Sequence, residues 1–227
     1  MNREMELYRL LQINGGTFPT GGFSQSWGLE TYVSEGIITG EDSFTEFLEI
    51  FLDSNIGSCE GPVIREAYRL TGSSESEKLA ELEQLSVASK TTKESREAAV
   101  RMGKAFMRIM KEILRSEDFA YVKKLLGRDV SYPVAYGAAC KVMGTNPETA
   151  IRAYVYGSAN ALVQSAVKLI PLGNTQAQKI LYESAHVMDM AVKKSLETDM
   201  DDITNFCPGL DIASIRHETL PVRLYMS

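Results

Sequence analysis

Apolar residues recur every three or four positions along most of the chain, which is the period of an amphipathic helix. The clearest stripe lies between 43 and 55 and would face a core if this stretch were helical. No stretch alternates apolar and polar residues over the length of a strand, and no hairpin turn joins two such stretches. The pattern therefore predicts an all-α protein. The stripe consists of Phe44, Phe47, Leu48, Phe51 and Leu52.

Capping and breaking residues divide this pattern into roughly ten helices. Ser74 with Glu77 and Thr91 with Glu94 have the spacing of capping boxes, and Asn146 followed by a proline predicts a further helix start. The predicted ranges are 4–13, 24–35, 43–55, 61–70, a helix after 74, 94–114, 117–126, 133–144, 147–169, 174–192 and 211–217.

The predicted helix at 147–169 is apolar on nearly all sides and ends before Pro171 and Gly173. A helix of this kind is buried, so we expect it at the centre of the fold. No internal repeat or low-complexity linker interrupts the chain. We therefore expect residues 1–227 to form a single all-α domain around a central buried helix, with residues 210–227 as a C-terminal tail.

Composition narrows the range of functions. The net charge is -6 and the pI is about 5.1, which argues against nucleic-acid binding because that depends on neutralising phosphates. The uncharged stretch 153–167 is shorter than the ~20 residues that a membrane-spanning helix needs. Residues 1–6 carry acids and no apolar run, so we expect no secretory signal. Cys59, Cys140 and Cys207 are odd in number and widely spaced, which predicts reduced thiols in a cytoplasmic protein.

Groupings that carry catalysis are incomplete in this sequence. The G-x4-G spacing from Gly16 to Gly21 lacks the lysine and hydroxyl of a phosphate-binding loop. Ser24 has no second glycine at the position that a nucleophile elbow requires, so we interpret it as a helix cap. His186 and His217 are isolated, whereas a tight metal site needs three or four convergent ligands. We interpret His186 as structural, and for His217 a partner contact or cap and a purely local role both stay open.

The most distinctive stretch runs from Phe18 to Glu30, FPTGGFSQSWGLE. Gly21 and Gly22 allow positive φ or a close backbone approach, and Ser24 or Ser26 could cap a following helix. Phe23 and Trp27, four residues apart, would share one face of that helix.

This stretch resembles the N-terminal motif of the UreF family of urease accessory proteins, which reads P-x-G-G-F-S-x-S-x-G-L-E. The stretch from Ser165 to Gly173 and the stretch from Asp211 to Glu218, with the ending RLYMS at 223–227, resemble the same family in the same order. Lys168 stands where the family usually has arginine, Asn174 where glutamine is common, and Trp27 in a variable polar position. Lysine cannot replace arginine in a bidentate contact.

The resemblance implies an all-α, homodimeric cytosolic chaperone of urease maturation, with no catalytic, cofactor or metal site of its own. Its implied partners are the accessory protein UreD/UreH, the nickel-carrying GTPase UreG, and apo-urease. The family bridges these partners, and it has been proposed to modulate the GTPase so that hydrolysis is coupled to nickel insertion.

The tail is apolar and aromatic, although chain ends are usually polar and frayed. We therefore expect residues 216–227 to dock UreD/UreH, and residues 21–30 to form part of a partner-facing or dimer surface. The candidate partner-binding residues are Gly21, Gly22, Phe23, Ser24, Ser26, Gly28, Glu30, Lys168, Arg216, His217, Glu218, Arg223, Leu224 and Tyr225.

Other functions stay open at this point. Arg96 or Arg101 could supply an arginine finger, which would make the chain a GTPase-activating protein. The chain could also be an all-α interaction scaffold unrelated to urease, or, as a residual alternative, a free-standing enzyme or metal carrier.

Overall fold

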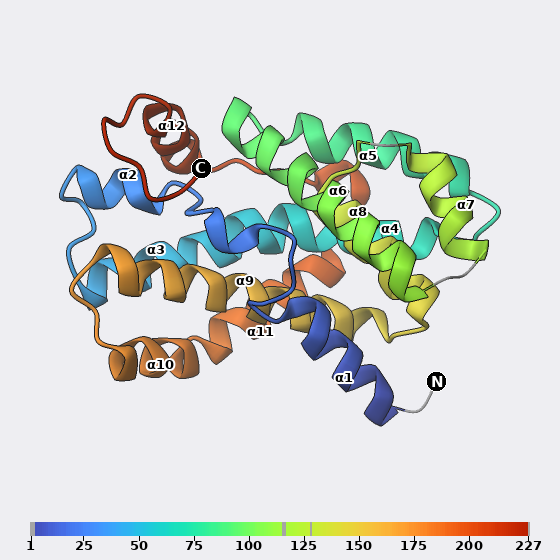
Figure 1. Cartoon of the computed structure of the whole chain (residues 1–227), viewed down its shortest axis with the longest axis horizontal. Helices are drawn as coiled ribbons and strands as arrows, with labels where there is room; N and C mark the ends of the chain where they lie inside the picture. The colour runs from blue at the N-terminus through green and yellow to red at the C-terminus, as the bar shows by residue number, and fades with distance from the viewer. Residues whose placement is uncertain (1–2, 115–116, 128, 227) are drawn as a thin grey trace.

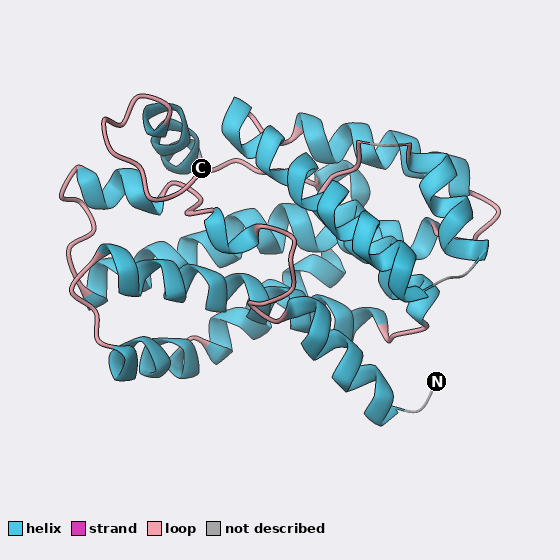
Figure 2. Ribbon diagram, viewed as in Figure 1, coloured by secondary structure: helices cyan, strands magenta, loops and turns pink. Residues whose placement is uncertain are grey.

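The computed structural model describes residues 3–114, 117–127 and 129–226. Met1, Asn2 and Ser227, which belong to the N-terminal and tail predictions, lie outside this range. All regular structure in the described part of the chain is helical, which confirms the all-α prediction (Figure 2). No helix within these ranges is both long enough and apolar enough to cross a bilayer.

The described part of the chain contains twelve α-helices, which are connected by turns, loops and short 3-10 segments and, in one place, by a π-helical segment. Their bounds are α1 Arg3–Asn14, α2 Leu29–Ser34, α3 Glu41–Ile50, the π-helix Phe51–Glu60, α4 Gly61–Leu70, α5 Leu79–Ala88, α6 Lys93–Leu114, α7 Glu117–Leu126, α8 Tyr132–Met143, α9 Pro147–Leu169, α10 Asn174–Glu183, α11 Ala185–Glu197 and α12 Pro208–His217.

Helix α9 crosses the middle of the molecule, as predicted (Figure 1). It packs against α1, α2, α3, α4, α8, α10 and α11, and one edge reaches solvent. Its start is the predicted one, because the Asn146 side chain accepts a hydrogen bond from the Thr149 amide at 3.0 Å. Helix α8, which packs against α4 and α6, is enclosed along nearly its whole length.

The predicted break at Gly61 and Pro62 is wrong. Residues 41–70 form one continuous helical rod, in which the π-helix links α3 to α4. Pro62 cannot donate to the Ser58 carbonyl, but that oxygen instead accepts a hydrogen bond from the Thr204 amide at 3.1 Å. A tertiary contact thus satisfies the group that the proline leaves free, and the helix continues.

Several predicted helix ends differ from the structure, including the predicted start at 211, which lies at Pro208. The Thr92 hydroxyl, one residue after the predicted cap, accepts the Ser95 amide at 3.2 Å, so Glu94 takes no part in a capping box. A short 3-10 turn, Ser76–Lys78, precedes α5 in place of the Ser74 box. The predicted last long helix is divided at Ser184 into α10 and α11.

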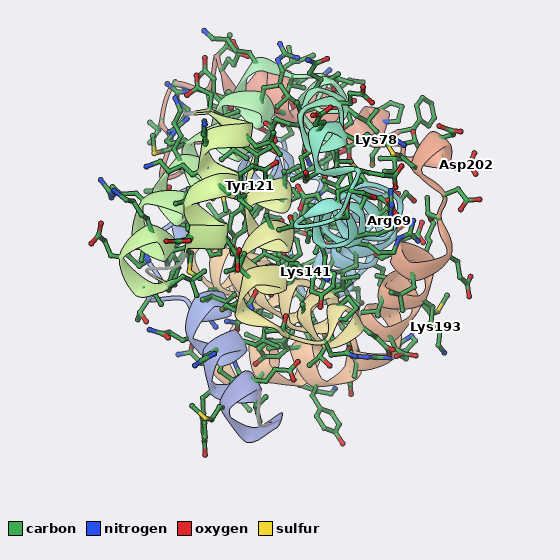
Figure 3. The ribbon with its side chains drawn as sticks, turned by 90° about the vertical axis from the view of Figure 1, so that its right-hand side faces the viewer. Arg69, Lys78, Tyr121, Lys141, Lys193 and Asp202 are labelled. Atoms are coloured by element: carbon green, nitrogen blue, oxygen red, sulfur yellow. The ribbon has the colours of Figure 1, made fainter. Side chains whose placement is uncertain are left out.

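The side of the molecule in Figure 3 carries exposed ion pairs. Arg69 binds Glu75 at 2.9 Å, and Lys193 binds Asp189 at 2.9 Å. Exposed pairs of this kind contribute little to stability. None of the candidate partner-binding residues takes part in these pairs.

A partly buried carboxyl group lies where α5 meets the start of α8. Glu83 accepts hydrogen bonds from the Ser131 amide and the Ser131 hydroxyl, both at 2.8 Å. Burial raises the pKa of Glu83 to about 7, and the two hydrogen bonds offset only part of this effect.

We expect Glu83→Gln to increase stability at pH 8 by about 1–3 kcal/mol and to have little effect near pH 5. The pKa of this acid is raised by folding, so its contribution to stability is present below pH 4.5 and lost as the pH rises through about 7. Urea unfolding from pH 5 to 8 measures the difference. Glu81→Gln, at an exposed position of the same helix, is the control. The expectation would be contradicted if the free energy of unfolding changed between pH 5 and 8 by the same amount for Glu83→Gln and for the unaltered protein.

Candidate functional site

The conspicuous N-terminal stretch and the C-terminal tail lie against each other, although they stand at opposite ends of the sequence. In Figure 1, α12 and the chain's C-terminal end lie beside α2 and the start of α6. The Met226 amide donates to the Ser24 carbonyl at 2.8 Å. The Thr31 hydroxyl donates to the Ala213 carbonyl at 2.8 Å. We call residues 21–30 the motif loop. We keep the name tail for residues 218–226, the described part of the predicted tail that follows α12.

The motif loop is not the helix predicted for 24–35. A 3-10 turn covers Gly22–Ser24, and α2 begins only at Leu29, after Gly28 with a φ of 85°. The Ser24 hydroxyl donates to the Gly21 carbonyl at 2.6 Å, so it closes the turn and does not cap α2. Ser26 accepts the Glu30 amide at 3.4 Å, a weak version of the predicted cap.

Phe23 and Trp27 do not share a helix face, because the chain between them turns. Trp27 has a φ of 50° and its ring lies 5.8 Å from that of Phe51, whereas Phe23 is exposed. Glycine is required at 28 for two reasons. Its φ is in the left-handed region, and a Cβ there would lie 3.1 Å from the Ala213 Cβ of α12.

Glu30 fastens the tail to the motif loop. Its side chain is buried, and its Oε1 accepts the Leu224 amide at 2.7 Å. Its Oε2 accepts the Tyr225 amide at 3.1 Å and lies 3.0 Å from His217 Nε2. A single carboxylate therefore binds two successive backbone amides of the tail and one imidazole.

His217 is fully buried between two carboxylates. Its Nδ1 lies 2.7 Å from Glu94 Oε2, while Arg223 binds the other oxygen of Glu94 at 3.2 Å. Only the doubly protonated ring can donate from both nitrogens. In that form the two acids are balanced by two cations. We call Glu30, Glu94, His217 and Arg223 the tail clasp.

Three further contacts complete the attachment of the tail. Tyr225 is buried under Lys168, whose ammonium lies 5.9 Å from the ring centroid. Arg101 approaches the Met226 sulfur at 3.3 Å. The Tyr225 hydroxyl is buried, and no residue within the described ranges forms a hydrogen bond with it.

The structure thus places many of the candidate residues next to one another. Some of them are buried and others are exposed. Glu30, His217 and Tyr225 are buried, so they position the tail. Arg216 pairs with Glu35 at 3.0 Å on the surface, and Glu218 is exposed. Whether any of them contacts a partner stays a prediction. The most exposed apolar side chains of the motif loop, α12 and the tail are Phe23, Ile212, Ile215, Val222, Leu224 and Met226.

Glu94 is the member of the clasp that sequence analysis missed. The capping-box pattern predicts a local role for it, and its partner His217 lies 123 residues further along the chain. Arg96 is engaged locally, because one nitrogen of its guanidinium donates to the Lys90 and Thr91 carbonyls at 2.8 and 2.7 Å. Arg101 is exposed on the next turns of α6.

The tail clasp does not have the geometry of a metal site, because the two carboxylates bind opposite nitrogens of the ring. Among the described residues, no group of three or more His, Cys, Asp or Glu could hold a metal ion. His186, at the surface, contacts the Glu183 carbonyl at 3.0 Å. The cysteines are free thiols, and burial raises the pKa of Cys140 to about 12.

Known proteins match this chain in sequence over most or all of its length. A sequence model of the UreF family matches residues 38–185. The chain is similar to a urease accessory protein UreF of Bacillus sp. (strain TB-90), with 32% identity over 100% of both chains. It is also similar to that of Sporosarcina pasteurii, with 31% identity over 88% of this chain and 100% of the relative, and to that of Arthrobacter sp. (strain FB24), with 30% identity over 96% of both. The full-length matches include the motif loop and the tail.

Proposed function

The chain belongs to the UreF family of urease accessory proteins, and from this membership we propose that it bridges UreD/UreH and the GTPase UreG during nickel insertion into apo-urease. We further propose that it acts in the cytoplasm as a homodimer. The family name describes an accessory protein and not a catalyst. The alternative of a scaffold unrelated to urease is set aside, because the relatives are urease accessory proteins.

The proposed docking site is supported by two properties of the tail, its ordered backbone and its exposed apolar side chains. Its backbone is held by Glu30, while Val222 and Leu224 are 78% and 70% exposed. Exposed apolar groups favour partner binding, and a backbone that is already ordered loses less conformational entropy on association. We therefore propose that UreD/UreH binds the outer side of the tail, together with Phe23 of the motif loop.

Modulation of the GTPase would follow from differential binding. A bridging protein that prefers one nucleotide state of its partner shifts that equilibrium by the difference in affinity, about 1–3 kcal/mol for a typical coupled site. In this proposal the chain contributes binding energy and no reacting group.

Removal of residues 222–227 is expected to abolish co-purification with UreD/UreH. The double change Val222→Asp and Leu224→Asp is the sharper variant, because it leaves the Glu30 contacts to the backbone in place. Both variants should keep their helical circular dichroism. Tyr8→Asp places one such charge at an exposed residue of α1, a helix on the opposite side of the molecule from α12 in Figure 1, and should bind normally. Undiminished co-purification of the double variant would reject the proposed docking site.

A second candidate is a direct GTPase-activating role for Arg101, favoured by its exposure beside the tail. If Arg101 is an arginine finger, Arg101→Ala should lower the stimulated GTP hydrolysis of UreG by about 10³-fold or more. Arg108→Ala, at an exposed arginine of the same helix, is the control. Equal hydrolysis with both variants would exclude this role.

A further inference from the structure

A cavity of about 240 Å³ lies behind the motif loop. It is lined by residues of α9, of the first half of α6, of the π-helix and of the segment 13–27, and on one side by Asn205 and by Leu210, Asp211 and Ser214 of α12. Its apolar wall includes Trp27, Phe51 and Met102, and its polar wall includes Asn55, Asn205 and Ser214. The residues of the tail clasp do not line this cavity, whereas Phe23 of the proposed docking surface does.

The π-helix directs two polar side chains to the cavity. Lys90, itself buried, donates to Asn55 Oδ1 at 3.2 Å and to Glu60 Oε1 at 2.5 Å. The Tyr154 hydroxyl donates to the other oxygen of Glu60 at 2.8 Å. Because Lys90 has only donors, it fixes the orientation of the Asn55 amide with the oxygen toward the ammonium.

Two buried polar atoms of the cavity wall have no hydrogen-bond partner among the residues that the structure describes. Asn55 Nδ2, on a side chain that is more than nine-tenths buried, has no acceptor there, and Asn205 Oδ1 has no donor. The contact between the Thr204 amide and the Ser58 carbonyl holds the Asn205 loop against the π-helix that carries Asn55. Buried polar groups are normally hydrogen-bonded, so this pair lacks one molecule with both an acceptor and a donor.

The charges of the wall favour a neutral molecule. The ionisable acids and bases that line the cavity are Glu60, Asp211, Lys90 and Lys168, two of each sign, and Glu60 and Lys90 already neutralise each other. An anion would face Glu60 and a cation would face Lys90. Asp211 and Lys168 add one further charge of each sign, so the lining as a whole carries no net charge.

We propose that this cavity binds a small neutral carboxamide. The carbonyl of the ligand would accept from Asn55 Nδ2, and its N–H would donate to Asn205 Oδ1. The rest of the ligand would lie against the rings of Trp27 and Phe51. A cavity of about 150 Å³ can hold benzene, so the volume here is sufficient for an aromatic ring that carries an amide.

Benzamide is a suitable probe, and the isosteric anion benzoate tests the charge argument. We expect titration of the full ¹⁵N-labelled chain to give saturable shifts of the Asn55 and Asn205 side-chain amides. The dissociation constant should be on the order of 1 mM or below for a ligand of about nine heavy atoms. Benzoate should bind at least about tenfold more weakly.

Asn55→Asp keeps the acceptor for Lys90 and removes the unpaired N–H, so benzamide affinity should fall about tenfold. Asn174→Asp makes the same change at an exposed position outside the cavity and should leave the affinity unchanged. If Asn55→Asp does not fold, Asn205→Ala tests the proposal in its place, and the same fall in benzamide affinity is expected. The absence of saturable shifts, equal binding of benzoate, or unchanged affinity in the folded cavity variants would overturn the proposal.

Discussion

Replacement of His217 by alanine should lower the free energy of unfolding by about 3–5 kcal/mol. The substitution would leave Glu30 and Glu94, both largely buried, without the ring that lies between them. Two carboxylates in one buried site repel each other, and each loses a hydrogen bond. Because Glu30 also accepts the Leu224 and Tyr225 amides, the tail should loosen.

Urea unfolding measures the loss, and hydrogen exchange at the amides of Leu224 and Tyr225 reports whether the tail is released. His186→Ala is the matched control, because His186 lies at the surface. It should cost less than about 0.5 kcal/mol. Adding Glu94→Gln to His217→Ala removes one of the two facing charges and should restore part of the stability. A loss below about 1 kcal/mol for His217→Ala would contradict the importance of the clasp.

Gly137→Ala is expected to destabilise the fold by about 3 kcal/mol or more. The same change at an exposed position in a helix normally stabilises it by about 1 kcal/mol. Gly137 lies where α8 crosses α4, and an added methyl group would overlap the Ile64 carbonyl oxygen and lie 2.9 Å from the Ala67 Cβ. The two helices would have to separate along one of the most buried contacts of the molecule.

Thermal unfolding provides the measurement, with Gly16→Ala as the control. A Cβ at Gly16 would have no atom within 4 Å, and the backbone there does not require glycine, so this variant should be at least as stable as the original protein. If Gly137→Ala unfolds within about 1 kcal/mol of the unaltered protein, the close approach of α4 and α8 is not required.

The tail clasp holds the segment that carries the proposed docking surface, so a change in the clasp should affect both the stability of the fold and the proposed binding. The same Glu30 that supports the tail backbone lies within the conspicuous stretch of the motif loop. Variants at His217 should therefore weaken both folding and the proposed binding of UreD/UreH. Variants at Val222 and Leu224 should weaken binding alone, since those side chains are exposed.

Helix periodicity, proline and asparagine at helix starts, and the two terminal stretches could all be recognised from sequence. These features depend on residues within about four positions of each other, where helical contacts are formed. The all-α class, the central α9 and the Asn146 cap were therefore predictable. The two ends of the chain could each be identified as distinctive, but nothing local showed that they touch.

The continuity of α3 and α4, the clasp and the cavity depend on atoms far apart in sequence. Pro62 interrupts the helix in any local prediction, whereas in the structure the Thr204 amide, from beyond α11, donates to the Ser58 carbonyl. Glu30 and His217 are 187 residues apart, and no local sequence pattern around either residue identifies the other as its partner. The period of a helix follows from residues that are close together in the sequence. Which buried polar groups pair with each other depends on distant segments that pack together and exclude water from those groups.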